Sequence, residues 1–154
     1  MTAIGLAAAA AQEAPSPARR FYDDAIRIVA EVKDGVTGEG WCWRAAFNIG
    51  HFVKGYRAFN DPAWLDYGVR YYDALLAQMA EGPDGYRGWI GPYIYDGKEQ
   101  ADVHIGDAIL FNGMLEFAVL VHETPALQAR YGEKAAEYVR QARRHLIEKW
   151  DARG

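Results

Sequence analysis

Three ionisable side chains lie close together near the middle of the chain. Asp102, His104 and Asp107 belong to the stretch "ADVHIGD", which opens a long apolar segment. His104 and Asp107 are three positions apart, so a helix that has already begun would place both on one face. A carboxylate beside an imidazole raises the basicity of the ring and fixes its tautomer. The sequence therefore predicts Asp102, His104 and Asp107 as candidate catalytic residues.

Such a group could transfer protons in more than one reaction. It could abstract a proton beside the carboxyl group of a uronate, as a lyase or an epimerase requires, or assist hydrolysis as acid and base. A hydrolase with two carboxylates needs them roughly 5 to 9.5 Å apart, and Asp102 with Asp107 is one candidate pair. The structural alternative for Asp102 is capping of the next helix or bracing of the loop. We expect no cofactor and no metal site, because no HExxH-like or Cys-rich spacing occurs.

Aromatic residues gather in the same region, around the loop at 86–107. Aromatic planes can stack on sugar rings, and they equally serve to pack a loop against helices. Both interpretations stay open from the sequence. The residues predicted to bind a substrate are Trp41, Trp43, His51, Trp89, Tyr93, Tyr95 and Asp96.

Apolar residues recur at helical spacing through most of the chain. Two polar-polar-Pro turns, "NDP" and "ETP", separate helical segments, and Asn60 or Asp61 is expected to cap the helix after the first turn. In the last segment the predicted core-facing residues are Ala135, Val139, Ala142, Leu146 and Trp150. The predicted helices cover residues 17–34, 41–59, 62–79, 103–123 and 125–150.

An internal repeat links two of these helical segments. Gly50 and Gly113 are 63 positions apart, and so are Pro62 and Pro125. A Tyr-Gly pair follows each proline within the next helix. Repeated helical hairpins form stacked arrays. The predicted fold is therefore all-α, with about five helices in antiparallel hairpins and a short Gly- and aromatic-rich loop or β-hairpin at 85–97, where 86–90 would pair with 92–96.

The stretch "GWCWRAAFNIGHFVKGYRAFNDPAWLDYGVRYYDALL" resembles the hairpins of the six-hairpin glycosidase-like superfamily, the (α/α)6 toroids. The turn Asn60-Asp61-Pro62 matches the Thr-Gly-Asp-Pro-like turn of that family, and "ADVHIGDAILFNGMLEFAVLV" is similar to a further inner helix. The resemblance implies a partial α/α toroid with a carbohydrate substrate. A full toroid has twelve helices, so it also implies a fragment, or a short array that self-associates through exposed terminal helices.

The charge balance argues against some partners. The chain has 17 Lys and Arg residues against 21 Asp and Glu residues, a formal net charge of -4. It lacks the basic excess that binding to nucleic acid or to an anionic membrane requires, so neither partner is expected. The single cysteine, Cys42, lies between two tryptophans and is read as a small buried hydrophobe.

Residues 1–16 differ in composition from the rest. They are read as a flexible tail or as the remnant of a signal peptide with an A-x-A site at Ala9 and Ala11, which indicates a secreted or periplasmic protein. Residues 17–154 are expected to form one helical-hairpin domain of a larger toroid. Two functions remain: part of a glycoside hydrolase or polysaccharide lyase acting on oligo- or polysaccharides, or a non-catalytic, TPR-like module that binds a protein or peptide.

Overall fold

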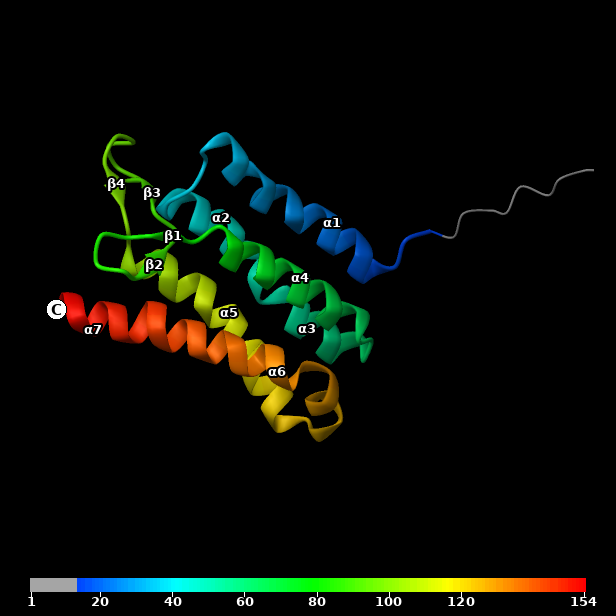
Figure 1. The fold of residues 1–154 in the computed structure, drawn as a ribbon. Helices are drawn as coiled ribbons and strands as arrows, with labels where there is room; N and C mark the ends of the chain where they lie inside the picture. Colours follow the sequence, from blue (N-terminus) through cyan, green and yellow to red (C-terminus); the bar gives the residue numbers. More distant parts are fainter. Residues whose placement is uncertain (1–13) are drawn as a thin grey trace, which may run out of the picture.

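The computed structural model describes residues 14–154, which form antiparallel helical hairpins (Figure 1). This confirms the predicted all-α class. Residues 1–13, with the A-x-A site, lie outside the described part. The helices are α1 Pro17–Ala30, α2 Glu39–Ile49, α3 His51–Phe59, α4 Ala63–Ala77, α5 His104–Glu123, α6 Pro125–Ala142 and α7 Lys149–Arg153. A 3-10 turn covers Glu31–Asp34, a π-helical segment covers Arg143–Glu148, and the short strands are β1 Ala80–Glu81, β2 Arg87–Gly88, β3 Gly91–Pro92 and β4 Gln100–Ala101.

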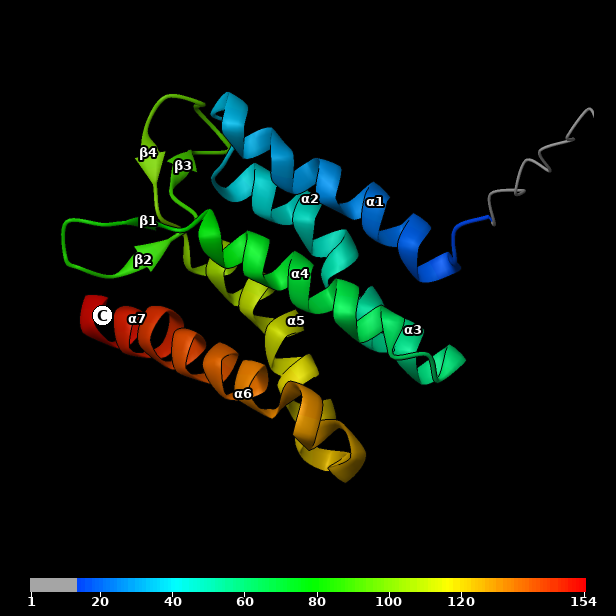
Figure 2. The same cartoon turned by 45° about the vertical axis from the view of Figure 1, so that its right-hand side comes forward.

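The helices lie in two layers (Figures 1 and 2). We call α1, α4 and α6 the outer layer, and α2, α3 and α5 the inner layer. Within the inner layer α2 and α5 run parallel, because Gly106 lies against Cys42 and Gly113 lies against Ile49. The connections α1–α2, α3–α4, α4–α5 and α5–α6 each lead from one layer to the other, as stacked hairpins require, whereas α2 continues into α3 within the inner layer.

The internal repeat is visible in the packing of the outer layer. The ring of Tyr67 in α4 stacks on Tyr22 in α1, with ring centroids 4.9 Å apart. The hydroxyl group of Tyr131 in α6 donates a hydrogen bond to Asp66 Oδ1 in α4, at 2.8 Å. Each tyrosine of a Tyr-Gly pair thus contacts the preceding outer helix. The two hairpins stack in the same way.

Helix ends follow the signals in the sequence. The side chain of Ser16 accepts a hydrogen bond from the backbone N–H of Arg19, at 3.2 Å, and Pro17 occupies the first turn of α1. Asn60 takes a left-handed conformation, φ 51°, and ends α3. Asp61 Oδ1 then accepts a hydrogen bond from Ala63 N, at 2.9 Å, where α4 begins. Asp61 is therefore the capping residue of the two that the sequence offered.

Two predicted helices are interrupted. The segment 41–59 forms two helices, α2 and α3, that meet at Gly50. The last predicted helix is interrupted by the π-helical segment Arg143–Glu148. Its core-facing side includes Tyr138, which is fully buried, whereas Val139 is 46% exposed. The prediction for Val139 was wrong. The Tyr138 ring packs edge-on against Tyr72, which a count of aliphatic spacing does not reveal.

The segment between α4 and α5 contains two small hairpins, with β1 paired to β2 and β3 paired to β4. The predicted pairing of 86–90 with 92–96 was wrong, because Gly91-Pro92 belongs to β3 and pairs with Gln100-Ala101. A Cβ atom on Gly91 would lie 2.4 Å from the backbone nitrogen of Gly38. This close backbone contact holds β3 against the start of α2.

Helix α5 is apolar on nearly all sides. Within residues 14–154 it is the one helix long and apolar enough to cross a membrane, and 56% of that window is buried in the fold. Its core face packs against α6 and α2. The opposite face reaches the surface at Ile105 and Val119, which are 43% and 51% exposed.

Candidate functional site: a groove on the inner layer

A groove of about 420 Å³ runs between the inner helices. Residues from α2 and α3 form one wall, and residues from α5 form the other. We call it the inner groove. Its lining residues are Ala46, Ile49, Gly50, His51, Lys54, Ala108, Ile109, Asn112, Gly113 and Glu116.

Two glycines give the inner groove its shape. A Cβ atom on Gly113 would lie 2.4 Å from Ile49 Cγ1, so only glycine lets α5 approach α2 this closely. Gly50 lies where α2 ends and α3 begins, and its Cβ position would be 3.4 Å from Glu116 Oε2 and 3.7 Å from Lys54 Nζ. The two repeat glycines therefore meet at one helix crossing. They leave room for polar side chains beside it.

The polar side chains of the inner groove come from both walls. On α5 the side-chain amide of Asn112 donates a hydrogen bond to Glu116 Oε1, at 3.4 Å. On α3 the exposed side chains of His51 and Lys54 lie across from them. A carboxylate, an amide, an imidazole and an ammonium group thus surround one hollow. Glu116 and His51 are the two of these side chains whose type can serve as a general acid or base.

Exposed aromatic residues extend this face toward the start of α2. Trp43 and Phe47 are four residues apart in α2, so they lie on one face of that helix. The ring of His51, at the start of α3, lies against Phe21 of α1, with ring centroids 5.4 Å apart. Trp43 is 44% exposed and Phe47 is 74% exposed. The indole N–H of Trp43 donates a hydrogen bond to Glu39 Oε1, at 3.4 Å. The edge of the ring is therefore bonded within α2.

Trp41 and Trp89 occupy the core instead of a surface. Their exposed fractions are 1% and 2%. The indole N–H of Trp41 donates to Ile28 O at 2.8 Å, and that of Trp89 donates to Leu75 O at 2.9 Å. Both rings therefore have the packing role that the sequence had left open. The prediction that aromatic residues stack on a sugar therefore depends on Trp43, Tyr93 and Tyr95.

Tyr93, Tyr95 and Asp96 lie in the second hairpin, near the start of α2. The rings of Tyr93 and Tyr95 meet edge to face with centroids 5.4 Å apart, and Tyr95 is 84% exposed. Asp96 Oδ1 accepts hydrogen bonds from the backbone N–H groups of Lys98 and Glu99, at 2.9 and 3.2 Å. Asp96 therefore shapes the turn, while the two tyrosines are available to a ligand.

The predicted catalytic carboxylates are bound by the last helix. Lys149 Nζ, fully buried, lies 3.0 Å from Asp102 Oδ2 and also forms an ion pair with Asp107. Arg153 Nη1 lies 2.9 Å from Asp102 Oδ2. The indole N–H of Trp150 donates a hydrogen bond to Asp107 Oδ2, at 2.9 Å. We call these five residues the C-terminal ion cluster.

Through these contacts Asp102 and Asp107 attach the start of α5 to α7. Asp102 does not cap α5, since no side chain accepts a bond from the first turn of that helix. Burial raises the pKa of Asp107 to about 6, although the contact with Lys149 opposes this shift. The exposed ring of His104 lies against Trp150, with centroids 5.1 Å apart. Asp102, His104 and Asp107 are therefore brought together, but by α7 and outside the inner groove.

Several of these partners were absent from the sequence prediction. Lys149, Trp150 and Arg153 lie more than forty residues after the carboxylates they bind. Helical spacing places Lys149 beside the core-facing Leu146, and a lysine at such a position signals a buried ion pair. Asn112 and Glu116, polar within an apolar helix, carried the signal for the inner groove.

Other chemistries find little support in the described residues. Residues 14–154 contain no group of three or more His, Cys, Asp or Glu side chains placed to hold a metal ion. Cys42 is buried, and burial raises the pKa of its thiol far above the usual range, so the thiol stays protonated. Neither a metal centre nor a cysteine nucleophile emerges from this part of the chain.

Comparisons of the chain with protein-family models, with curated proteins and with solved structures found no match.

Proposed function

We propose that the chain is part of a carbohydrate-active protein, of the glycoside hydrolase or polysaccharide lyase type, and that the inner layer carries its sugar-binding face. The observation that carries this proposal is the combination of two exposed aromatic residues of α2, Trp43 and Phe47, with the polar residues that line the inner groove. Aromatic planes with a few convergent polar groups are what a polar, flat-faced ligand requires. The resemblance of the hairpins to those of α/α toroids supports the same substrate class.

Within this proposal the exposed aromatic residues of α2 and the polar groups of the inner groove have separate roles. Trp43 and Phe47 offer planes to the C–H faces of sugar rings, while Asn112 and Lys54 supply hydrogen-bond donors to hydroxyl or carboxylate oxygens. Glu116 and His51 are the groups for proton transfer. Glu116 is the one carboxylate among the groove residues, so a hydrolase of the two-carboxylate kind would need its second carboxylate from elsewhere.

Thermal unfolding with a panel of neutral and uronic-acid oligosaccharides tests the proposal. A ligand that binds only the folded state stabilises it by about 2.7 kcal/mol at a hundred times its dissociation constant. We expect one sugar class to raise the unfolding midpoint of the full chain in a saturable way. Trp43→Ala should reduce this shift, whereas Phe59→Ala, at an exposed aromatic residue outside the inner groove, should keep it.

Two outcomes would count against carbohydrate binding. Either no sugar changes the midpoint, or the shift persists unchanged in Trp43→Ala. A well-folded chain without any glycan response would favour the second function, a helical-hairpin module that binds a protein or peptide.

A further inference from the structure

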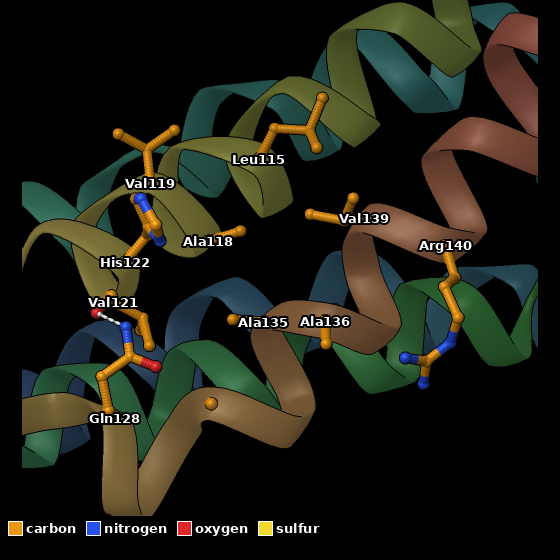
Figure 3. A pocket seen from close by; sticks show the side chains of 11 residues that line it. Leu115, Ala118, Val119, Val121, His122, Gln128, Ala135, Ala136, Val139 and Arg140 are labelled. Carbon is orange, nitrogen blue, oxygen red and sulfur yellow. Dashed lines mark hydrogen bonds between the residues drawn. The ribbon is translucent and has the colours of Figure 1, made fainter.

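A second groove, of about 740 Å³, lies between α5 and α6 at the edge of the helical array (Figure 3). We call it the edge groove. Its walls are almost entirely apolar: Leu115, Ala118 and Val119 line it from α5, and Ala135, Ala136 and Val139 line it from α6. Val119 and Val139 are about half exposed, at 51% and 46%. Small residues form its floor and larger aliphatic residues form its flanks.

The equivalent surface of the preceding hairpin is covered. In α4 the ring of Tyr72 packs edge-on against Phe117 of α5 and Tyr138 of α6, with ring centroids 5.8 and 5.6 Å apart. The Tyr-Gly pairs of α4 and α6 are 64 residues apart, and counting 64 residues onward from Tyr72 leads to Ala136 in α6. Ala136 lines the edge groove. The groove is thus the surface onto which a further helix of this array would pack.

Charges beside the groove favour an antiparallel partner. Glu133 lies three residues before Ala136 and Arg140 lies four residues after it, and both side chains are exposed. Within the described part of the chain neither forms an ion pair. A second α6 helix that runs antiparallel and crosses at Ala136 would place its Arg140 opposite Glu133, and its Glu133 opposite Arg140. The same register sets Val139 of each copy opposite Gly132 of the other.

We propose that the edge groove binds a second copy of this chain through a two-fold, antiparallel contact of α6 with α6. An isologous contact of this kind uses the same patch on both subunits and closes without further growth. The small residues let the two backbones approach, and the valine side chains of one copy occupy the hollow of the other. The two ion pairs fix direction and register.

Sedimentation equilibrium of the full chain provides the test. We expect the wild type to dimerise. Glu133→Arg alone and Arg140→Glu alone place like charges opposite each other, so each should weaken the homodimer at least about 10-fold. An equimolar mixture of the two variants restores opposite charges at both positions. The mixture should therefore form a heterodimer of near wild-type affinity.

The control is Glu99→Arg, which makes the same charge change at an exposed residue of the second hairpin and should leave dimerisation unchanged. Circular dichroism confirms that each variant keeps its helices. A wild type that stays monomeric at every concentration would overturn the proposal and leave the groove to a helix of another sequence. A dimer that both single variants leave intact would place the interface elsewhere and overturn it equally.

Discussion

Lys149 has the most demanding environment of any single residue in the fold. Its ammonium group is fully buried and contacts the carboxylates of Asp102 and Asp107 and, at 3.1 Å, the carbonyl oxygen of Arg87. Arg153 adds a second positive charge beside Asp102 and also pairs with Asp84, at 2.7 Å. Three carboxylates therefore contact the two cations. These ion pairs tie α7 to the start of α5 and to the first hairpin.

Removing the cation should be costly, because it leaves Asp107 buried without its partner. We expect Lys149→Met to lower the free energy of unfolding by about 3 to 5 kcal/mol. The matched control is Lys134→Met, because Lys134 also contacts two carboxylates, Asp73 and Glu137, but its side chain is 37% exposed. That variant should lose about 1 kcal/mol or less. Urea unfolding measures both, and equal losses would show that the burial of Lys149 carries no special weight.

The loss in Lys149→Met should also depend on pH. Burial raises the pKa of Asp107 from 3.8 to about 6, so the folded state holds this proton more tightly than the unfolded state. Its contribution to stability therefore falls as pH rises from 3.8 through about 6. Without Lys149, a protonated Asp107 is tolerated better than an ionised one. We expect a smaller loss at pH 5 than at pH 8, and a loss independent of pH would contradict this account.

At the scale of elements, the crossing of α2 and α5 determines the shape of the inner groove. Ile49 packs directly against Gly113, and Cys42 packs against Gly106. The Gly113 contact leaves no room for a Cβ atom, and the Gly106 contact is tight, with the Cβ position 3.1 Å from Cys42 Sγ. The repeat glycines are therefore packing residues first, and the groove beside them is a consequence.

A methyl group at the crossing should force the helices apart. Gly113→Ala would place a Cβ atom 2.4 Å from Ile49 Cγ1, and overpacking of this kind costs about 1 to 3 kcal/mol. Gly40→Ala is the control, because no atom lies within 4 Å of its Cβ position in α2. That substitution should stabilise the chain by about 0.4 to 1 kcal/mol. Chemical unfolding compares the two, and a neutral Gly113→Ala would rule out a tight crossing.

Local signals in the sequence predicted most of the elements. The cap at Asp61, the turn signal at Pro62 and the apolar length of α5 depend on neighbouring residues alone, so they can be read directly. The burial of Tyr138 and Lys149 depends on partners far along the chain. No periodicity encodes such contacts. Of the residues that line the inner groove, the predicted site residues include His51, and tertiary packing decided which of the other predicted residues face solvent.

At the scale of the whole molecule, the fold of residues 14–154 has two surfaces of different character. The inner layer presents Trp43, Phe47 and the polar residues of the inner groove, while the edge between α5 and α6 is apolar. A polar face with exposed aromatic rings suits a hydrated ligand, whereas an apolar groove suits another helix. The two proposals use separate residues, so each can fail without the other.

The most direct test of the central claim is an NMR titration of the indole N–H signals with the oligosaccharide panel. The chain has five tryptophans, so each indole can be assigned by substitution. Our account predicts that a bound sugar shifts the signal of Trp43, while those of the buried Trp41 and Trp89 stay in place. If no glycan moves the Trp43 signal, or if only Trp150 beside His104 responds, the inner layer is not the sugar-binding face.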